Sequence, residues 1–318
     1  MKKIDNGINQ ELLHNLKKDI NYIKKIPASF QTEEMAFLVI DKDITLFKYI
    51  ELRTPQICSR AIEKDPNTIK YIEKPSKSLE KIAVTSLPTV IQYLENPSSS
   101  LWKIALEKNG NCLQYLNKQT EDLCLIALKN TPSAIQYVLN ITPDLAFSAI
   151  SENGLLLQYI KDQTRDMVLK AVSEDGLALR FANILDEEIY MIAVKQNGSA
   201  LEYVEEQTFD ICLTAILNST EAIKFVHEQT ALLSLISVLK NGLSLEYIHN
   251  QDERICLEAI KQNPNAISFV KEMKIEYKII AVKNCLKKIK NSPSYLNEIT
   301  DLKLKKVVSK LIFEKQEE

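Results

Sequence analysis

Tyrosine and phenylalanine residues recur along the sequence at a constant spacing of 22, and their ring faces are the most regular chemistry that the chain offers. Bases of a single-stranded nucleic acid can stack on such a row of rings. Rings in this pattern can also close the gaps between stacked helices, with each hydroxyl group at the edge of the core. Phenylalanine replaces tyrosine three times, which favours the second interpretation. The row consists of Tyr49, Tyr71, Tyr93, Tyr115, Tyr137, Tyr159, Phe181, Tyr203, Phe225, Tyr247 and Phe269.

Metal chemistry is the next candidate, because two histidines hold equivalent places in this pattern. His227 and His249 each lie two residues after an aromatic, and Glu205 holds that place one unit earlier. Imidazole and carboxylate groups are zinc ligands, but stacked helices would separate these positions by about 10 Å. His14 lies outside the pattern, and neither a Gly-x-Ser-x-Gly motif nor a glycine-rich phosphate loop occurs. We therefore expect no catalytic residue, no metal and no cofactor, and so no enzyme.

Cysteine placement indicates packing rather than redox chemistry. Four cysteines lie thirteen residues before an aromatic, where Ala36 and Ala146 also occur, as expected of a small buried side chain. The closest of them are two units apart, which at about 8–10 Å per unit is too far for a disulfide. No apolar leader or stretch of 18 apolar residues is present. We expect no membrane association and a cytoplasmic location, in bacterial or host cytosol. The four are Cys58, Cys124, Cys212 and Cys256.

The elements that position these residues are predicted by further rows in the same register. Small residues lie ten before the aromatic, as at Ala61 and Ala193, and apolar residues lie fourteen before it, as at Ile57 and Ile189. These offsets fit one face of a helix, and the offsets closest to the aromatic fit a second helix. In the fifth unit we expect these helices at about Glu121 to Asn130 and Pro132 to Asn140.

Turn residues support two helices per unit. Ser, Thr or Asp lies five residues after most aromatics and can cap the next helix, as at Thr54, Ser98 and Asp252. In most units, either Asx-Gly or a residue followed by Pro stands between the two helices. We expect these glycines to adopt positive φ and end the first helix. They are Gly110, Gly154, Gly176, Gly198 and Gly242.

The predicted fold class is all-α, an α-solenoid of about eleven 22-residue two-helix repeats with helical caps. We divide the chain into an N-terminal helical cap at residues 1–32, a repeat solenoid at 33–274 and a basic C-terminal helical cap at 275–318. In the last segment we expect one fused helix at about Ile275 to Lys290 and a final helix capped by Thr300.

Charge is distributed unevenly, although the net charge is only −2. Residues 26–270 carry 22 basic and 32 acidic residues, a net of −10, whereas residues 271–318 carry twelve Lys and seven acids. Nucleic-acid binding needs a contiguous basic surface, so the acidic body argues against that partner. Because the C-terminal helices are basic, nucleic-acid binding through these helices is kept as the alternative.

The row of positions twelve residues before each aromatic changes from polar to apolar along the chain. It is polar at Ser59, Lys81 and Lys103, and from Leu125 onward it is apolar. Either a neighbouring helix covers this row, or it forms an exposed apolar ridge that marks a partner or self-association surface. Leu217 and Leu239, four residues further on, break a row that is polar in most other units. The candidate partner-binding residues are Met191, Leu213, Leu217, Leu235 and Leu239.

The segment from Ala193 to Val204, AVKQNGSALEYV, resembles the repeat of a widespread family known as a domain of unknown function. Ala171 to Phe181 and Val238 to Ile248 are close copies, and the likeness weakens in the first three units. The family has no accepted activity, so the resemblance assigns no site residue. It implies a helical scaffold of the kind found in large viruses and intracellular bacteria and used against host or competitor proteins.

The expected function is therefore a non-catalytic scaffold that binds a protein partner through its solenoid surface. The partner is not identified by the sequence, and a second copy of the chain is one candidate. The alternative is a nucleic-acid-binding repeat protein that uses the basic C-terminal helices.

Overall fold

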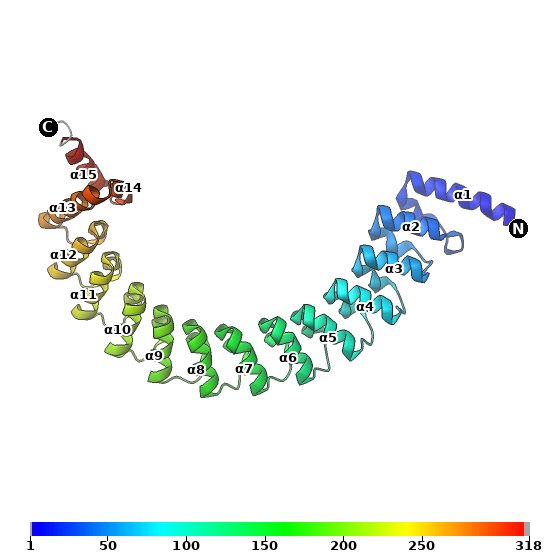
Figure 1. Ribbon diagram of the computed structural model, residues 1–318, viewed down its shortest axis with the longest axis horizontal. Coiled ribbons are helices and arrows are strands. Elements are labelled where there is room, and N and C mark those ends of the chain that lie inside the picture. Colours follow the sequence, from blue (N-terminus) through cyan, green and yellow to red (C-terminus); the bar gives the residue numbers. More distant parts are fainter. Residues whose placement is uncertain (1, 315–318) are drawn as a thin grey trace. The chain divides into compact units, whose positions relative to one another are not determined.

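The computed structural model describes residues 2–314, which hold α-helices and 3-10 helices and no strand. Ten-residue α-helices alternate with six-residue 3-10 helices (η) along the repeats (Figure 1). Contacts divide the chain into two compact units, one ending at Ala149 and the other beginning at Ile150, within α7. The chain is an all-α repeat solenoid, as the 22-residue period predicts.

In the first unit the α-helices from α2 to α6 contact one another in succession, and the 3-10 helices from η3 to η7 do the same. Neither row is stable alone, because helices this short persist only when packed. The elements are α1 Lys2–Lys18, η1 Ile20–Lys25, η2 Ala28–Phe30, α2 Glu33–Lys42, η3 Ile44–Tyr49, α3 Pro55–Lys64, η4 Pro66–Tyr71, α4 Lys77–Ser86, η5 Pro88–Tyr93, α5 Ser99–Lys108, η6 Gly110–Tyr115, α6 Glu121–Asn130, η7 Pro132–Tyr137 and α7 Pro143–Glu152.

The second unit continues the same alternation and ends in three α-helices of 17, 4 and 13 residues. Its elements are η8 Gly154–Tyr159, α8 Arg165–Glu174, η9 Gly176–Phe181, α9 Glu187–Gln196, η10 Gly198–Tyr203, α10 Phe209–Asn218, η11 Thr220–Phe225, α11 Ala231–Lys240, η12 Gly242–Tyr247, α12 Glu253–Gln262, η13 Pro264–Phe269, α13 Ile275–Asn291, α14 Tyr295–Glu298 and α15 Leu302–Glu314. Each of the eleven periodic aromatics ends a 3-10 helix, so the row occupies one structural position throughout.

The second element of each repeat differs from the prediction. In the fifth unit the first helix is Glu121–Asn130 as expected, but the second ends at Tyr137 instead of about Asn140 and is a 3-10 helix. Its closing hydrogen bonds run from residue i+3 to residue i, for example from the Val138 amide to the Ile135 carbonyl at 3.1 Å. A six-residue segment held between two turns has room for these tighter bonds and little for an α-helical ladder.

Side-chain caps begin most α-helices at the predicted places. The Thr54 hydroxyl accepts from the Ile57 amide at 3.4 Å, and the Asp252 carboxylate accepts from the Ile255 amide at 2.8 Å. Thr120 is an exception, since its side chain makes no such bond. These bonds satisfy amide groups that have no partner within the helix, and so set where each α-helix starts.

The prediction of positive φ at the five repeat glycines is wrong, because no described residue has positive φ. The preceding Asx residue is extended, with φ of −152° at Asn109, and its side chain caps the 3-10 helix by accepting from the Asn111 amide at 3.1 Å. Glycine is required instead by a close approach between repeats. A Cβ atom on Gly154 would lie 2.2 Å from the carbonyl oxygen of Ala171 in the next repeat.

Terminal segments cover the two ends of the repeats. Leu16 and Ile23 are buried in a cluster with the first repeat, and Leu12, Leu13 and Ile20 pack against that cluster. At the other end, α13 is the expected fused helix. The cap of the last helix is Asp301 rather than Thr300, because the Asp301 carboxylate accepts from the Leu304 amide at 2.7 Å.

Candidate protein-binding surface

The outward side of each α-helix in the repeats is formed by three positions, which lie sixteen, twelve and eight residues before the aromatic. These positions are four residues apart, so they share one side of the helix. In α10 all three are large and apolar, namely Phe209, Leu213 and Leu217. In α11 the two later positions are Leu235 and Leu239. We refer to these five residues as the α10–α11 outer face.

Exposure differs between the three positions. Leu217 is 53% exposed, Leu239 52% and Phe209 43%, whereas Leu213 and Leu235 are half-buried. Met191, on the neighbouring α9, is also half-buried. At Met191, Leu213 and Leu235 the row twelve residues before the aromatic is therefore neither core nor a fully exposed ridge. Its side chains form the floor of an apolar strip whose exposed margin is Phe209, Leu217 and Leu239.

Charged residues flank this face on both neighbouring helices. The same three outward positions read Glu187, Met191 and Lys195 in α9, and Glu253, Leu257 and Lys261 in α12. The glutamates lie in the first turn of each helix and the lysines in the last turn, where they complement the helix dipole. An apolar patch with a polar rim is the usual form of a protein-interaction surface on a soluble protein.

The backbone beneath the face is held by contacts between repeats. The Lys240 ammonium group donates to the Leu217 carbonyl, and the Asn218 side-chain amide donates to the Lys195 carbonyl at 2.8 Å. The Gly198 amide in turn donates to the Asn218 side-chain oxygen at 2.8 Å. These bonds satisfy carbonyl groups at the helix ends, which have no partner within their own helix. They fix the spacing of α9, α10 and α11.

Sequence reasoning missed a set of glutamines that join successive repeats. The Gln207 side-chain amide donates to the Leu201 carbonyl at 3.3 Å and to the Phe225 carbonyl of the next repeat at 2.9 Å. Its oxygen accepts from the His227 amide at 2.9 Å. The signal was a glutamine four residues after the aromatic, at spacings of 22 or 44. Such glutamines bridge repeats in this way at Gln119, Gln163, Gln207, Gln229 and Gln251, and Gln31, which precedes the aromatic row, makes the same bridge to the first repeat.

The remaining candidates are placed as follows. His227 and His249 are exposed, and the backbone amide of each donates to a bridging glutamine. Within residues 2–314, no group of three or more His, Cys, Asp or Glu side chains could hold a metal ion. The aromatic rings are half-exposed, and several lie beneath a cation: the Lys48 nitrogen is 5.1 Å from the Tyr49 ring centre. A cation over the ring is a stabilising contact that occupies a face on which a base would stack.

All six cysteines are free and buried. Burial raises the pKa of the Cys112 thiol to about 11, and burial likewise raises the pKa of Cys285 to about 11. Removal from water disfavours the charged thiolate. These groups are therefore protonated near neutral pH, where they act as apolar packing residues with little nucleophilic character.

The sequence of these repeats matches the model of a family described as a domain of unknown function, DUF4116. The matches cover residues 100–141, 142–185, 164–209, 186–229 and 233–274, which together exceed half of the chain. The chain belongs to this family. No curated protein and no solved structure matches the chain. No helix in the described part of this DUF4116 chain is both long and apolar enough to cross a membrane. The α10–α11 outer face lies within the matched repeats.

Proposed function

We propose that the chain is a non-catalytic scaffold that binds a protein partner through the α10–α11 outer face. The observation that carries this proposal is the exposure of three large apolar side chains, Phe209, Leu217 and Leu239, at positions that carry polar residues in most other repeats. Removing such apolar surface from water is favourable by about 25 cal/mol for each Å², and this term opposes the entropy cost of association. The repeats themselves supply a rigid support.

The shape of the face indicates what kind of partner fits. The ten residues of one α-helix span about 15 Å, and the face is two adjacent helices wide. A partner helix or extended segment with an apolar side can cover such an area, with its polar edges against Glu187, Lys195, Glu253 and Lys261. A second copy of the chain could also supply this segment. The proposed setting is the cytosol of a bacterium or a host cell, where a viral or pathogen accessory protein would meet host or competitor proteins.

The test compares a double substitution on the face with a matched one elsewhere. Leu217→Lys with Leu239→Lys places charge on the face without cutting into the core, because both side chains are more than half exposed. Ser151→Lys with Ser173→Lys adds the same charge at the equivalent, exposed positions of α7 and α8. Partners purified from the native cell with the wild-type chain are identified by mass spectrometry, and their affinities for all three proteins are then measured.

We expect the leucine variant to lose affinity about tenfold or more and the serine variant to bind like the wild type. Sedimentation analysis of the same proteins separates binding to another protein from self-association. If the leucine variant is folded and binds every recovered partner with unchanged affinity, the α10–α11 outer face is not the binding surface.

A further inference from the structure

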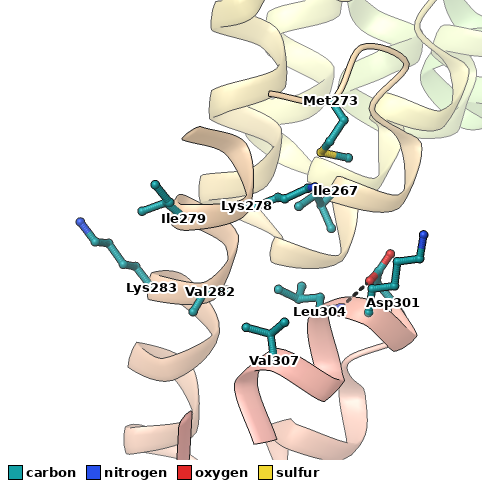
Figure 2. Close-up of a pocket in the computed structure, with 10 residues that line it drawn as sticks. Ile267, Met273, Lys278, Ile279, Val282, Lys283, Asp301, Leu304 and Val307 are labelled. Atoms are coloured by element: carbon teal, nitrogen blue, oxygen red, sulfur yellow. Dashed lines mark hydrogen bonds between the residues drawn. The ribbon is translucent and has the colours of Figure 1, made fainter. Parts of the chain in front are cut away.

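An apolar cavity opens between α13 and α15, at the C-terminal end of the repeats (Figure 2). Its volume is about 580 Å³, within the range of sites that hold ligands or partner side chains. Figure 2 shows Val282 of α13 facing Leu304 and Val307 of α15 across the cavity. Ile267, Met273 and Ile279 complete the apolar lining.

The cavity exists because α13 is the last helix of the repeat row. The α-helices from α9 to α12 each contact the α-helices of the repeats before and after, whereas α13 contacts one repeat helix, α12, and the terminal helices α14 and α15. The α15 helix covers α13 incompletely. Ile279 remains 48% exposed and Val307 50% exposed. Two apolar helix surfaces thus form the walls of an open groove.

Positive charge surrounds this groove. Lys278, Lys283 and Lys303 line it, and among residues 2–314 no hydrogen bond or ion pair to their ammonium groups is found. Asp301 is the single acidic residue of the lining. Its carboxylate caps α15, since one oxygen accepts from the Leu304 amide at 2.7 Å and the other accepts from the Ser268 hydroxyl at 3.3 Å. The groove therefore presents apolar walls and a rim with three positive charges against one negative charge.

We propose that this groove binds an amphipathic helix of a partner protein, with its apolar side in the groove and acidic residues along its flanks. Charge complementarity selects the acidic flanks, because carboxylates opposite the three lysines gain favourable interactions and basic residues are repelled. Helix-in-groove binding uses apolar residues at i, i+3, i+4 and i+7. Two walls formed by neighbouring helices accept that pattern as the packing surface of a third helix.

A helix fits the groove better than a small amphiphile such as a fatty acid. Outside the cavity lining, Ile275 at the start of α13 and Leu302 at the start of α15 are 63% and 81% exposed. A single acyl chain of about the cavity volume would leave these two side chains in water, whereas a helix lying along the groove covers them. Amphiphile binding remains a distinct outcome of the test.

This site is independent of the α10–α11 outer face. The α12 helix lies between α11 and α13, and its two outer positions at the helix ends are charged, with Glu253 and Lys261. The two surfaces can therefore be altered separately. Loss of one leaves the other in place, so each proposal can fail without the other.

The experiment uses the full chain and three probes. The acidic probe is a fluorescent helical peptide of about 16 residues with leucines on one side and glutamates on the flanks. The basic probe has the same leucines with lysines on the flanks. Laurate is the small amphiphile. We expect the acidic probe to bind about tenfold or more tightly than the basic probe, and its binding to weaken as salt is raised.

Charge reversal makes the test specific. The triple variant Lys278→Glu, Lys283→Glu and Lys303→Glu changes exposed residues and is expected to prefer the basic probe. Val307→Glu is expected to weaken binding of the acidic probe about tenfold. Circular dichroism checks that each variant is folded. The variant Leu217→Lys with Leu239→Lys serves as the control and should bind the acidic probe like the wild type.

Several results would overturn the inference. They are failure of the acidic probe to bind, equal binding of both peptides, or unchanged preference in the folded triple variant. If the Leu217→Lys, Leu239→Lys control no longer binds the acidic probe, the probe binds at the α10–α11 outer face and not in the groove. Saturable laurate binding without peptide binding would make the groove a site for small amphiphiles.

Discussion

A Cβ atom on Gly198 would lie 2.4 Å from the carbonyl oxygen of Ala215 in the next repeat. This oxygen is fixed, because it accepts the Ser219 amide that ends α10 at 2.8 Å. The 3-10 row and the α-helical row of successive repeats therefore meet backbone to backbone. A side chain on residue 198 would therefore separate the two rows at this contact.

Replacing Gly198 with alanine should lower the free energy of unfolding by about 1–3 kcal/mol, because the added methyl group must displace the Ala215 backbone. Urea unfolding followed by circular dichroism measures the change. Gly7→Ala is the matched control, because nothing lies within 4 Å of a Cβ atom added there. In α1 that substitution should be neutral or stabilising by up to about 1 kcal/mol. Equal midpoints for wild type and Gly198→Ala would contradict the close-approach explanation.

Sequence patterns predicted the repeat correctly because each row has one environment throughout the chain. The rows of Ala193 and Ile189 and the aromatic row repeat at 22 residues, and their burial repeats with them. The prediction of positive φ at the glycines was wrong because an Asx-Gly pair can have two structural roles. It commonly gives positive φ at a helix end, but here the Asx side chain caps the 3-10 helix, and the glycine leaves room for the backbone of the next repeat.

Other features could not be read from the period alone. The row of bridging glutamines is less regular than the aromatic row, because other residues hold the same place elsewhere: Arg53, Pro75, Pro97, Ile141, Leu185 and Met273. Exposure at the α10–α11 outer face depends on how far neighbouring helices cover Leu213 and Leu235, which is set by packing distance. The sequence located the unusual residues, and the structure gave their exposure.

Replacing Gln207 with leucine should lower the free energy of unfolding by about 1–3 kcal/mol. The substitution keeps most of the volume but leaves the Phe225 carbonyl and the His227 amide without the partner that now joins two repeats. Gln158→Leu is the control, since the exposed Gln158 side chain bonds only within its own repeat, to the Leu155 carbonyl at 3.1 Å. Hydrogen exchange of the His227 amide should accelerate in the first variant. Equal stability of the two variants would show that the bridge is unimportant.

Cys112 should make stability fall at high pH. Below about pH 9 its thiol is protonated in both the folded and unfolded chain, and burial raises the folded pKa to about 11. Between these values the unfolded thiol ionises while the folded one stays protonated, so the free energy of unfolding decreases. Cys112→Ala removes this effect. Alanine is native to the equivalent position of other repeats, such as Ala134 and Ala178.

The measurement for Cys112 is the difference in unfolding free energy between wild type and Cys112→Ala, followed from pH 8 to 11. Lysines and tyrosines titrate in the same range in both proteins, so their contributions cancel in the difference. We expect the wild type to lose stability relative to the variant only above about pH 9. A difference that stays constant across this range would mean that the folded thiol ionises as readily as the unfolded one.

Replacing both Leu217 and Leu239 with lysine should leave the stability of the chain within about 0.5 kcal/mol of the wild type. Both side chains are more than half exposed and lie in the last turn of their helices, where a positive charge complements the helix dipole. Leu213→Lys with Leu235→Lys is the contrasting pair, because these side chains are half-buried and form the floor of the same face. We expect that pair to cost about 2 kcal/mol or more, from lost burial and the placement of charge against apolar neighbours. Urea midpoints of the two double variants give the comparison. If the exposed pair is as destabilising as the floor pair, Leu217 and Leu239 stabilise the solenoid itself, and their apolar character needs no partner to explain it.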